Sequence, residues 1–202
     1  MKKVVLGAAL GLSAIFASCG LIPPIPVDDV LALDNVETAA VSLAGKNQLT
    51  TQAATGTLIA DVTFDDIAAL GSSPVVPSSL SIRLGARGIT VANCPNAVGS
   101  TNFTASNIEV TLRNQGSAQG TIITFSNVTF TGSLANGFYT ASTVSGGQIT
   151  SIVLADVLNI LKNPGNGKNT ATVSLNLSAE SDSLKGCSVK FRFAKASGEV
   201  KF

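Results

Sequence analysis

Apolar and polar side chains alternate along most of the chain beyond residue 55. The clearest runs are 173–177 and 187–193, in which every second side chain is apolar and those between them are polar. This period of two predicts β-strands with one buried face, because successive side chains of a strand point to opposite sides. Similar runs occur at 57–64, 80–84, 89–91, 108–113, 120–131 and 138–144. We therefore expect about eight antiparallel strands.

Turn-forming residues separate several of these runs. The 85–88 segment (Gly-Ala-Arg-Gly) predicts a hairpin over residues 80–93, and the 114–117 segment (Asn-Gln-Gly-Ser) predicts a second one. Asn136-Gly137 is suited to a type I′ turn, in which both central residues have positive φ. These features predict an all-β, antiparallel Greek-key-type β-sandwich, immunoglobulin-like or jelly-roll-like in arrangement. The chain lacks the tryptophan that a true antibody-type domain carries between its cysteines.

One of these runs changes phase in its middle. Ile123 and Phe125 stand at odd positions, whereas Val128 and Phe130 stand at even positions. One extra residue near 126–127, in a β-bulge or a corner, would keep all four apolar side chains on the same face. The sequence therefore predicts a break in this strand with no change of the buried face.

The 149–161 segment departs from the alternation. Its apolar residues recur at helical spacing, and Lys-Asn-Pro-Gly at 162–165 predicts the end of a helix. We expect one helix that covers the core here. An alternative interpretation is a lid over a cavity that holds an apolar small molecule or lipid. The residues concerned in either case are Ile152, Val153, Val157, Ile160 and Leu161.

The first eighteen residues carry an export pattern. Lys2 and Lys3 precede a largely apolar run that ends in small residues. This arrangement predicts a secretory signal peptide, because the run is too short and wrongly flanked for a membrane-spanning helix. The mature protein would then begin outside the cytosol.

Residues 16–19 (Phe-Ala-Ser-Cys) resemble the lipobox of bacterial lipoproteins. The resemblance implies cleavage before Cys19 and attachment of diacylglycerol to its thiol. The protein would then be lipid-anchored in the bacterial cell envelope, facing the periplasm or the cell surface. We expect a signal peptide at 1–18, a Pro-rich membrane-proximal stalk at 19–28 and a single β-sandwich domain at 29–202.

Two further cysteines, Cys94 and Cys187, remain outside the signal region. An even pair in an exported chain favours a disulfide, because such bonds persist in oxidising compartments. The alternative is two buried thiols. Cys187 shares the phase of the apolar residues that follow it, whereas Cys94 is out of phase with those before it. A bulge or a turn near 94–95 would bring both sulfurs to the same face.

The composition excludes many catalytic mechanisms. With no histidine, Ser-His-Asp and Cys-His catalysis and histidine-ligated metals are excluded. The absence of tryptophan and the single tyrosine, Tyr139, disfavour aromatic platforms for sugars or bases. A carboxylate-dependent hydrolase is the least favoured of the remaining functions. We expect no enzymatic activity, no catalytic residues, no cofactor and no metal site.

Charge adds little to this picture. The chain has 13 basic and 12 acidic residues, and Lys2 and Lys3 would leave with the signal peptide. The remaining basic residues are scattered, which predicts no nucleic-acid partner. The expected partners are the membrane, through the N-terminal lipid, and an envelope protein or glycan. We therefore expect a non-catalytic structural, adhesion or partner-binding role, with binding of an apolar small molecule or lipid as the alternative.

Overall fold

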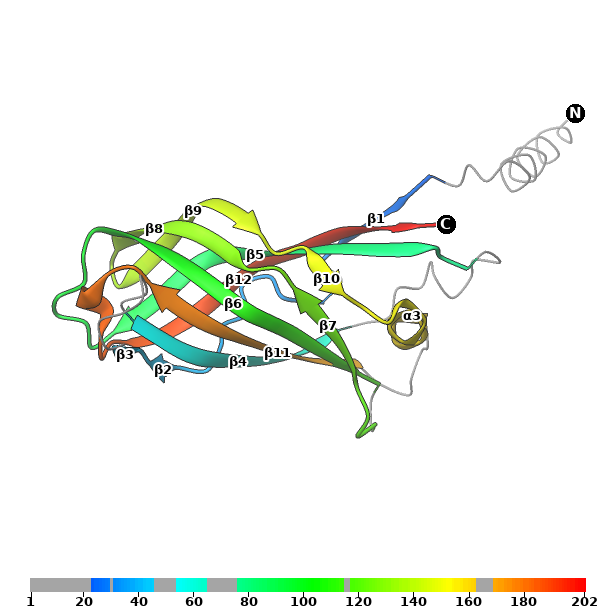
Figure 1. The fold of residues 1–202 in the computed structure, drawn as a ribbon, viewed down its shortest axis with the longest axis horizontal. Helices are drawn as coiled ribbons and strands as arrows, with labels where there is room; N and C mark the ends of the chain where they lie inside the picture. Colours follow the sequence, from blue (N-terminus) through cyan, green and yellow to red (C-terminus); the bar gives the residue numbers. More distant parts are fainter. Residues whose placement is uncertain (1–22, 30, 46–53, 65–75, 115–116, 163–168) are drawn as a thin grey trace, which may run out of the picture.

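A long antiparallel sheet and one α-helix form the fold in a computed structural model of the chain (Figure 1). The structure describes residues 23–29, 31–45, 54–64, 76–114, 117–162 and 169–202. Their strands are β1 (Ile25–Asp28), β2 (Val41–Ser42), β3 (Ala44–Gly45), β4 (Ala54–Phe64), β5 (Ser79–Ala92), β6 (Ser100–Arg113), β7 (Thr121–Phe125), β8 (Val128–Ala135), β9 (Phe138–Gly146), β10 (Ile149–Ser151), β11 (Asn169–Ala179) and β12 (Ser188–Lys201). The helix is α3 (Leu154–Lys162), and a 3₁₀ turn, η1 (Asp182–Leu184), precedes β12. The predicted all-β class with a single helix is confirmed within these residues.

The described strands belong to one sheet, which rolls around the core in a sandwich-like body. Its order is β1-β12-β5-β9-β8-β6-β11-β4-β3, and β7 and β10 extend β8 and β9 past short breaks. Every strand pair is antiparallel. β6, β8 and β9 are successive neighbours, and β9 then lies beside β5, which precedes β6 in the chain. Four strands in this order form a Greek key, which confirms the predicted connectivity.

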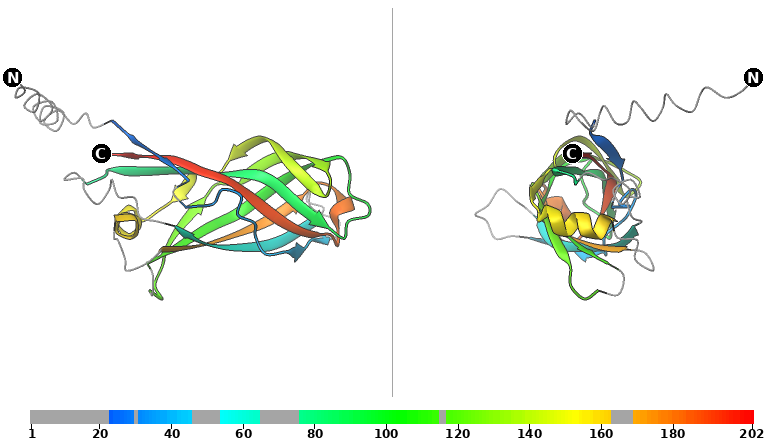
Figure 2. Two further views of the ribbon diagram at one scale, coloured as in Figure 1. Left: turned by 180° about the vertical axis from the view of Figure 1, so that it is seen from behind. Right: turned by 90° about the vertical axis from the view of Figure 1, so that its right-hand side faces the viewer.

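The rolled sheet has two ends, which we call the helix end and the disulfide end. At the helix end α3 lies across the roll, at the same end as the start of β1 and the last residues of β12 (Figure 2). At the disulfide end Cys94 and Cys187 are joined just beyond the end of β5. β5 runs from one end to the other, and its 14 residues span roughly 45 Å.

The free edge of β12 is covered by the first part of the described chain. We name residues 25–29 and 31–45 the N-terminal strap. β1 pairs with β12 near the helix end, and β2 pairs with β12 near the disulfide end. β3 then pairs with β4, so the strap supplies the strand at each end of the strand order. Leu31, Leu33 and Leu43 of the strap are buried in the core.

Aromatic side chains fill much of the interior. Phe103 stacks on Phe130 and meets Tyr139 edge-on, each at a ring-centroid distance of 5.2 Å. Phe130 also meets Phe191 of β12 edge-on, at 6.1 Å. The Tyr139 hydroxyl donates a hydrogen bond of 2.6 Å to the Val98 carbonyl, and burial raises the pKa of this phenol. The ring contacts therefore tie β6, β8, β9 and β12 into one core.

The break predicted in the middle of the 120–131 run is present. β7 ends at Phe125 and β8 begins at Val128, with residues 126–127 between them. Ile123, Phe125, Val128 and Phe130 are all buried. Two residues lie here where regular alternation would place one, and this one extra residue lets both strands keep their apolar faces on the same core.

Asn136-Gly137 forms the predicted turn between β8 and β9. Both residues have positive φ, 50° at Asn136 and 76° at Gly137. Asparagine and glycine tolerate this left-handed region better than other residues, which explains their place here.

The hairpin predicted over residues 80–93 is wrong. β5 continues through these residues as one strand, and its glycines serve close strand contacts. Gly88 lies opposite Thr140 of β9, where an added Cβ would overlap the Tyr139 carbonyl. Gly85 lies opposite Ala194 of β12, where an added Cβ would be tight, at 3.1 Å from the Ala194 Cβ. A glycine needed for close approach therefore resembles a turn glycine in sequence.

The helix predicted over residues 149–161 begins later than expected. Residues 149–151 form β10, which pairs with β7, and the hydroxyls of Thr150 and Thr124 lie 3.1 Å apart. β-Branched side chains suit this sheet pairing better than a helix. The helix starts at Leu154 and ends at Lys162, where the end was expected. Val153 precedes the helix and is 57% exposed, so its expected place in the core is also wrong.

The prediction of a stalk over residues 19–28 is wrong for residues 25–28. Residues 25–28 form β1 and belong to the sheet, and Val27 is buried. Pro26 is accommodated because β1 is an edge strand, which needs fewer backbone donors. β1 therefore belongs to the domain.

Val157→Asp should lower the free energy of unfolding by about 3 kcal/mol or more, because Val157 is fully buried and an unpaired carboxylate would enter the core. Val153→Asp is the matched control, since Val153 lies exposed just before the same helix. Urea unfolding of both variants measures the difference. Equal stabilities would show that α3 does not pack on the core as described.

Candidate functional site

The predicted disulfide between Cys94 and Cys187 is present, with a Cα–Cα distance of 5.0 Å. Asn93, at a φ of 56°, follows the end of β5 and turns the chain, so that Cys94 reaches Cys187 despite its phase. The Cys187 carbonyl accepts a hydrogen bond of 2.9 Å from the Leu43 amide. The disulfide therefore lies where the strap leaves β12, and it holds the loop after β5 to the same place.

The predicted lipidation site, Cys19, lies outside the described residues. The described chain begins at Pro23, four residues after Cys19. Among the described helices, none combines the length and the apolar character needed to cross a bilayer. Cys19 therefore stays a prediction from the lipobox resemblance.

The five residues predicted as a core-covering helix or a ligand lid differ in their burial. Ile152 is half-buried against the core, and Val153 is exposed. The Asn169 side-chain amide of β11 donates a hydrogen bond of 3.2 Å to the Ile160 carbonyl, which fixes α3 to the sheet. The others are fully or nearly fully buried in the core: Val157, Ile160 and Leu161. The helix thus closes the core at the helix end with its apolar side.

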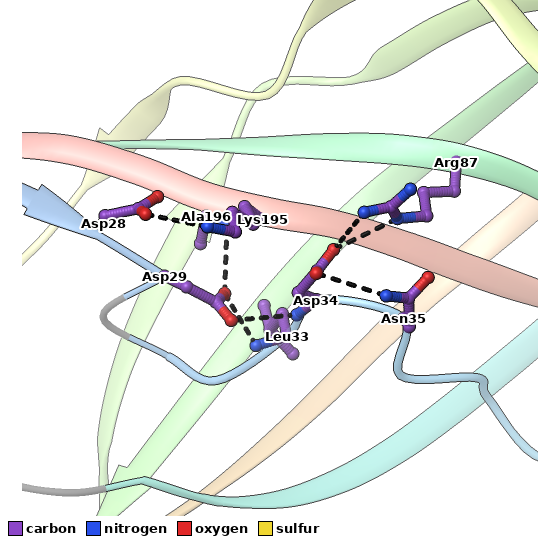
Figure 3. Close-up of polar contacts among 8 residues, drawn as sticks. All are labelled: Asp28, Asp29, Leu33, Asp34, Asn35, Arg87, Lys195 and Ala196. Carbon is purple, nitrogen blue, oxygen red and sulfur yellow. Dashed lines mark hydrogen bonds and ion pairs between the residues drawn. The ribbon is translucent and has the colours of Figure 1, made fainter.

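Asp29 organises the strap near its first turn (Figure 3). Its carboxylate accepts hydrogen bonds from three backbone amides: Leu33 at 2.9 Å, Asp34 at 3.1 Å and Ala196 at 3.2 Å. Ala196 lies where the register between β12 and β5 shifts, so its amide is outside the regular strand pairing. Asp29 itself has a φ of 52°. One side chain therefore satisfies the turn of the strap and the irregular part of β12 together.

Ion pairs follow the same side of the molecule. Asp28 accepts a hydrogen bond of 2.8 Å from Lys195, and Asp34 accepts one of 2.7 Å from Arg87 of β5 (Figure 3). The bond to Asp28 raises the pKa of the Lys195 ammonium. The Lys195–Asp28 pair is largely open to water and Arg87 is also exposed, so each pair adds little stability and chiefly favours one register of the strap.

Glu37 joins the strap to both β12 and β5. Its carboxylate accepts hydrogen bonds from the Arg192 guanidinium and from the Thr90 hydroxyl at 2.8 Å, and Lys190 lies 3.6 Å away. Arg192 also lies over the Phe138 ring, 4.9 Å from its centre. The hydrogen bond from Arg192 is the main cause that lowers the pKa of Glu37 below its ordinary value of 4.5. Because the folded pKa is the lower one, this contribution to stability is present above pH 4.5 and is lost as the pH falls through the folded pKa.

β5 and β10 diverge toward the helix end. Arg83 and Gln148 form an isolated bridge, and the Leu84 amide donates a hydrogen bond of 2.9 Å to the Gly147 carbonyl. Beyond this point, residues 79–82 pair only with β12 among the described strands. β10 pairs with β7 on its other side. We call this opening between β5 and β10 the fork.

A pocket of about 510 Å³ lies in the fork. Its walls are residues 80–83 of β5, residues 197–199 of β12, and Gln148 and Ile149. The apolar residues that line it are Leu80, Ile82 and Ile149, and the pocket is partly open to solvent. The volume falls within the range typical of small-molecule sites.

The polar groups around this pocket are partly engaged. The Arg83 side chain donates a hydrogen bond of 3.1 Å to the Gly146 carbonyl, and Glu199 forms an ion pair of 2.7 Å with Lys201. Among the pocket-lining residues, Glu199 is the one carboxylate. No cluster of three metal-binding side chains occurs in the described part of the chain. The arrangement offers apolar contact with a polar rim.

Sequence reasoning missed the residues that organise this region. Asp29 and Glu37 lie in a segment whose structure the periodicity left open, between residues 28 and 52. Their partners are on β12, more than 150 positions away. The Gly146-Gly147 pair, with positive φ at both residues, was a usable signal for the break that begins the fork.

Comparison of the chain with protein-family models, with curated proteins and with solved structures finds no significant match. The assignment of function therefore depends on the residues and on the geometry described above.

Asp29→Gly should destabilise the protein by about 1–3 kcal/mol, because three amides lose a carboxylate acceptor. Glycine accepts the positive φ of this position, so the loss reports on the carboxylate. Asp29→Asn is the control, since its remaining oxygen still accepts and the loss should be smaller. Urea unfolding with hydrogen exchange at Leu33 and Ala196 measures both effects. Unchanged exchange at these amides in Asp29→Gly would contradict the assigned role.

Proposed function

We propose that this protein is a lipid-anchored protein of the bacterial cell envelope that acts by binding and not by catalysis. The Cys94–Cys187 disulfide is the observation that carries this proposal. Structural disulfides persist in oxidising compartments such as the periplasm and the cell surface. The signal sequence and the lipobox-like residues 16–19 agree with this location.

The disulfide end supports the binding role. The loop between β5 and β6 and the Asn136-Gly137 turn lie there, on a scaffold fixed by the disulfide and by the aromatic core. Val98 in that loop is 38% exposed, and its carbonyl is held by the Tyr139 hydroxyl. Loops fixed on a rigid scaffold are common binding surfaces. An envelope protein or a glycan is the partner that we propose for this end.

Cys19→Ser should release the protein from the membrane, because the lipid would have no attachment site. The control is the double variant Cys94→Ser/Cys187→Ser, which keeps the anchor but should lower the melting temperature. Membrane fractionation and the intact mass of the purified mature protein measure the outcome. Membrane association of Cys19→Ser, or a mature N-terminus elsewhere without lipid, would reject the proposal.

Binding of an apolar small molecule or lipid is the second candidate function. The fork favours it, because Leu80, Ile82 and Ile149 are among the residues that line its pocket of about 510 Å³. The buried residues of α3 fill the core, so this site lies beside the helix and not beneath it. A ligand with one apolar group and a polar end suits such a pocket and its rim.

Ile149→Asp should weaken binding of the apolar probe N-phenyl-1-naphthylamine at least about tenfold, equivalent to 1.4 kcal/mol, by placing a charge in the pocket wall. Ile122→Asp on neighbouring β7 is the control, because Ile122 is exposed and does not line the pocket. Fluorescence titration measures affinity, and thermal melting checks that both variants fold. Equal affinities in the two folded variants, or no binding by the native protein, would exclude the fork as an apolar site.

A further inference from the structure

We propose that the helix end of the domain faces the bilayer and contacts its interfacial region, so that the molecule stands end-on to the membrane. This inference rests on the lipid anchor of the proposed function. The partner is the lipid surface itself, and three features of the described residues support the orientation: the length of the tether, the positions of exposed apolar side chains, and the charges on the flank.

The tether between the anchor and the fold is short. Pro23 is four positions after Cys19, and a fully extended chain over four positions spans at most about 14 Å. Ile25, two residues further on, pairs with Val200 at the helix end. The disulfide end lies farther away by the length of β5, roughly 45 Å. The anchor therefore holds the helix end close to the lipid as long as β1 stays paired.

Exposed apolar side chains gather at the same end. Five large apolar side chains are exposed among the described residues, and three of them are at the helix end. Val76 precedes β5 and is 72% exposed, Ile122 near the start of β7 is 52% exposed, and Val153 before α3 is 57% exposed. Apolar side chains on a membrane-associated surface enter the boundary between headgroups and acyl chains, which removes them from water.

The flank next to β1 is less suited to lipid contact. It carries the carboxylates of Asp28, Asp34 and Glu37 with their basic partners on β12 and β5. A molecule lying on this flank would lose water around these charges, which is costly for ions. Contact through the helix end leaves these three ion pairs hydrated and brings one exposed pair, Glu199–Lys201, near the headgroups. Of the two orientations that the short tether permits, the end-on one is therefore favoured.

The orientation assigns different surroundings to the two ends. The fork opens among the first residues of β5, so its pocket would lie near the bilayer surface. The disulfide end would point away from the membrane, toward the proposed partner. The β5–β6 loop and the Asn136-Gly137 turn would then be accessible to a macromolecule.

The absence of tryptophan from the natural chain allows a direct test. Val153→Trp and Val98→Trp each introduce a single tryptophan at an exposed position, one at each end. The full-length lipidated variants are reconstituted in phosphatidylcholine vesicles with brominated acyl chains, which quench tryptophan that contacts them. We expect emission from the Val153→Trp variant to fall at least about twofold relative to unbrominated vesicles, since interfacial side chains reach the acyl boundary. Emission from the Val98→Trp variant should be nearly unchanged.

Two controls and a flotation measurement distinguish failure of the anchor from failure of the orientation. Thermal melting shows whether each variant folds, and Ile122→Trp is a second reporter at the helix end. If the protein does not float with the vesicles, the proposed anchor is wrong and the orientation falls with it. If it floats but the two ends are quenched equally, or neither is quenched, the anchor stands and the end-on orientation is overturned.

Discussion

Pairing of the free edge of β12 is the constraint on which the rest of the structure depends. β12 is the last strand, and β5 covers only one of its edges. The N-terminal strap covers the other edge through β1, β2 and hydrogen bonds between Thr38 and Phe191. An uncovered edge of this length would leave backbone groups open to pairing with other chains. The irregular path of the strap also explains why Asp29 is needed, because a register shift leaves the Ala196 amide to a side chain.

The two ends of the domain are closed by different means. The helix end is covered by α3, whose Val157 and Leu161 side chains complete the apolar core. The disulfide end is fixed covalently, by a bond between the loop after β5 and the start of β12. Between these ends, β5 and β10 separate at the fork. The fork thus lies near the end that α3 closes, and the β5–β6 loop lies at the end that the disulfide fixes.

The sequence predicted those features that depend on local periodicity. Strands with one buried face were identified by alternation, and the phase change before Val128 correctly indicated a break. Gly88 was misread as a turn residue, because its role is to let β9 approach, and a distant strand leaves no local signal. The even pair of cysteines predicted the disulfide, whereas the fork and the contacts of Asp29 follow from tertiary pairing. Cys19 is still a prediction, since the described residues begin after it.

The position of the strap has a consequence for the order of folding. Ile25 pairs with Val200, and Glu37 binds Arg192, so the beginning of the domain closes onto its end. Contacts so distant in sequence form slowly, because a long loop must close before they are gained. A chain that emerges from its N-terminus cannot cover this edge until residues 188–201 of β12 are available. Until then the fold stays incomplete, and its unpaired strands are open to chaperones and proteases.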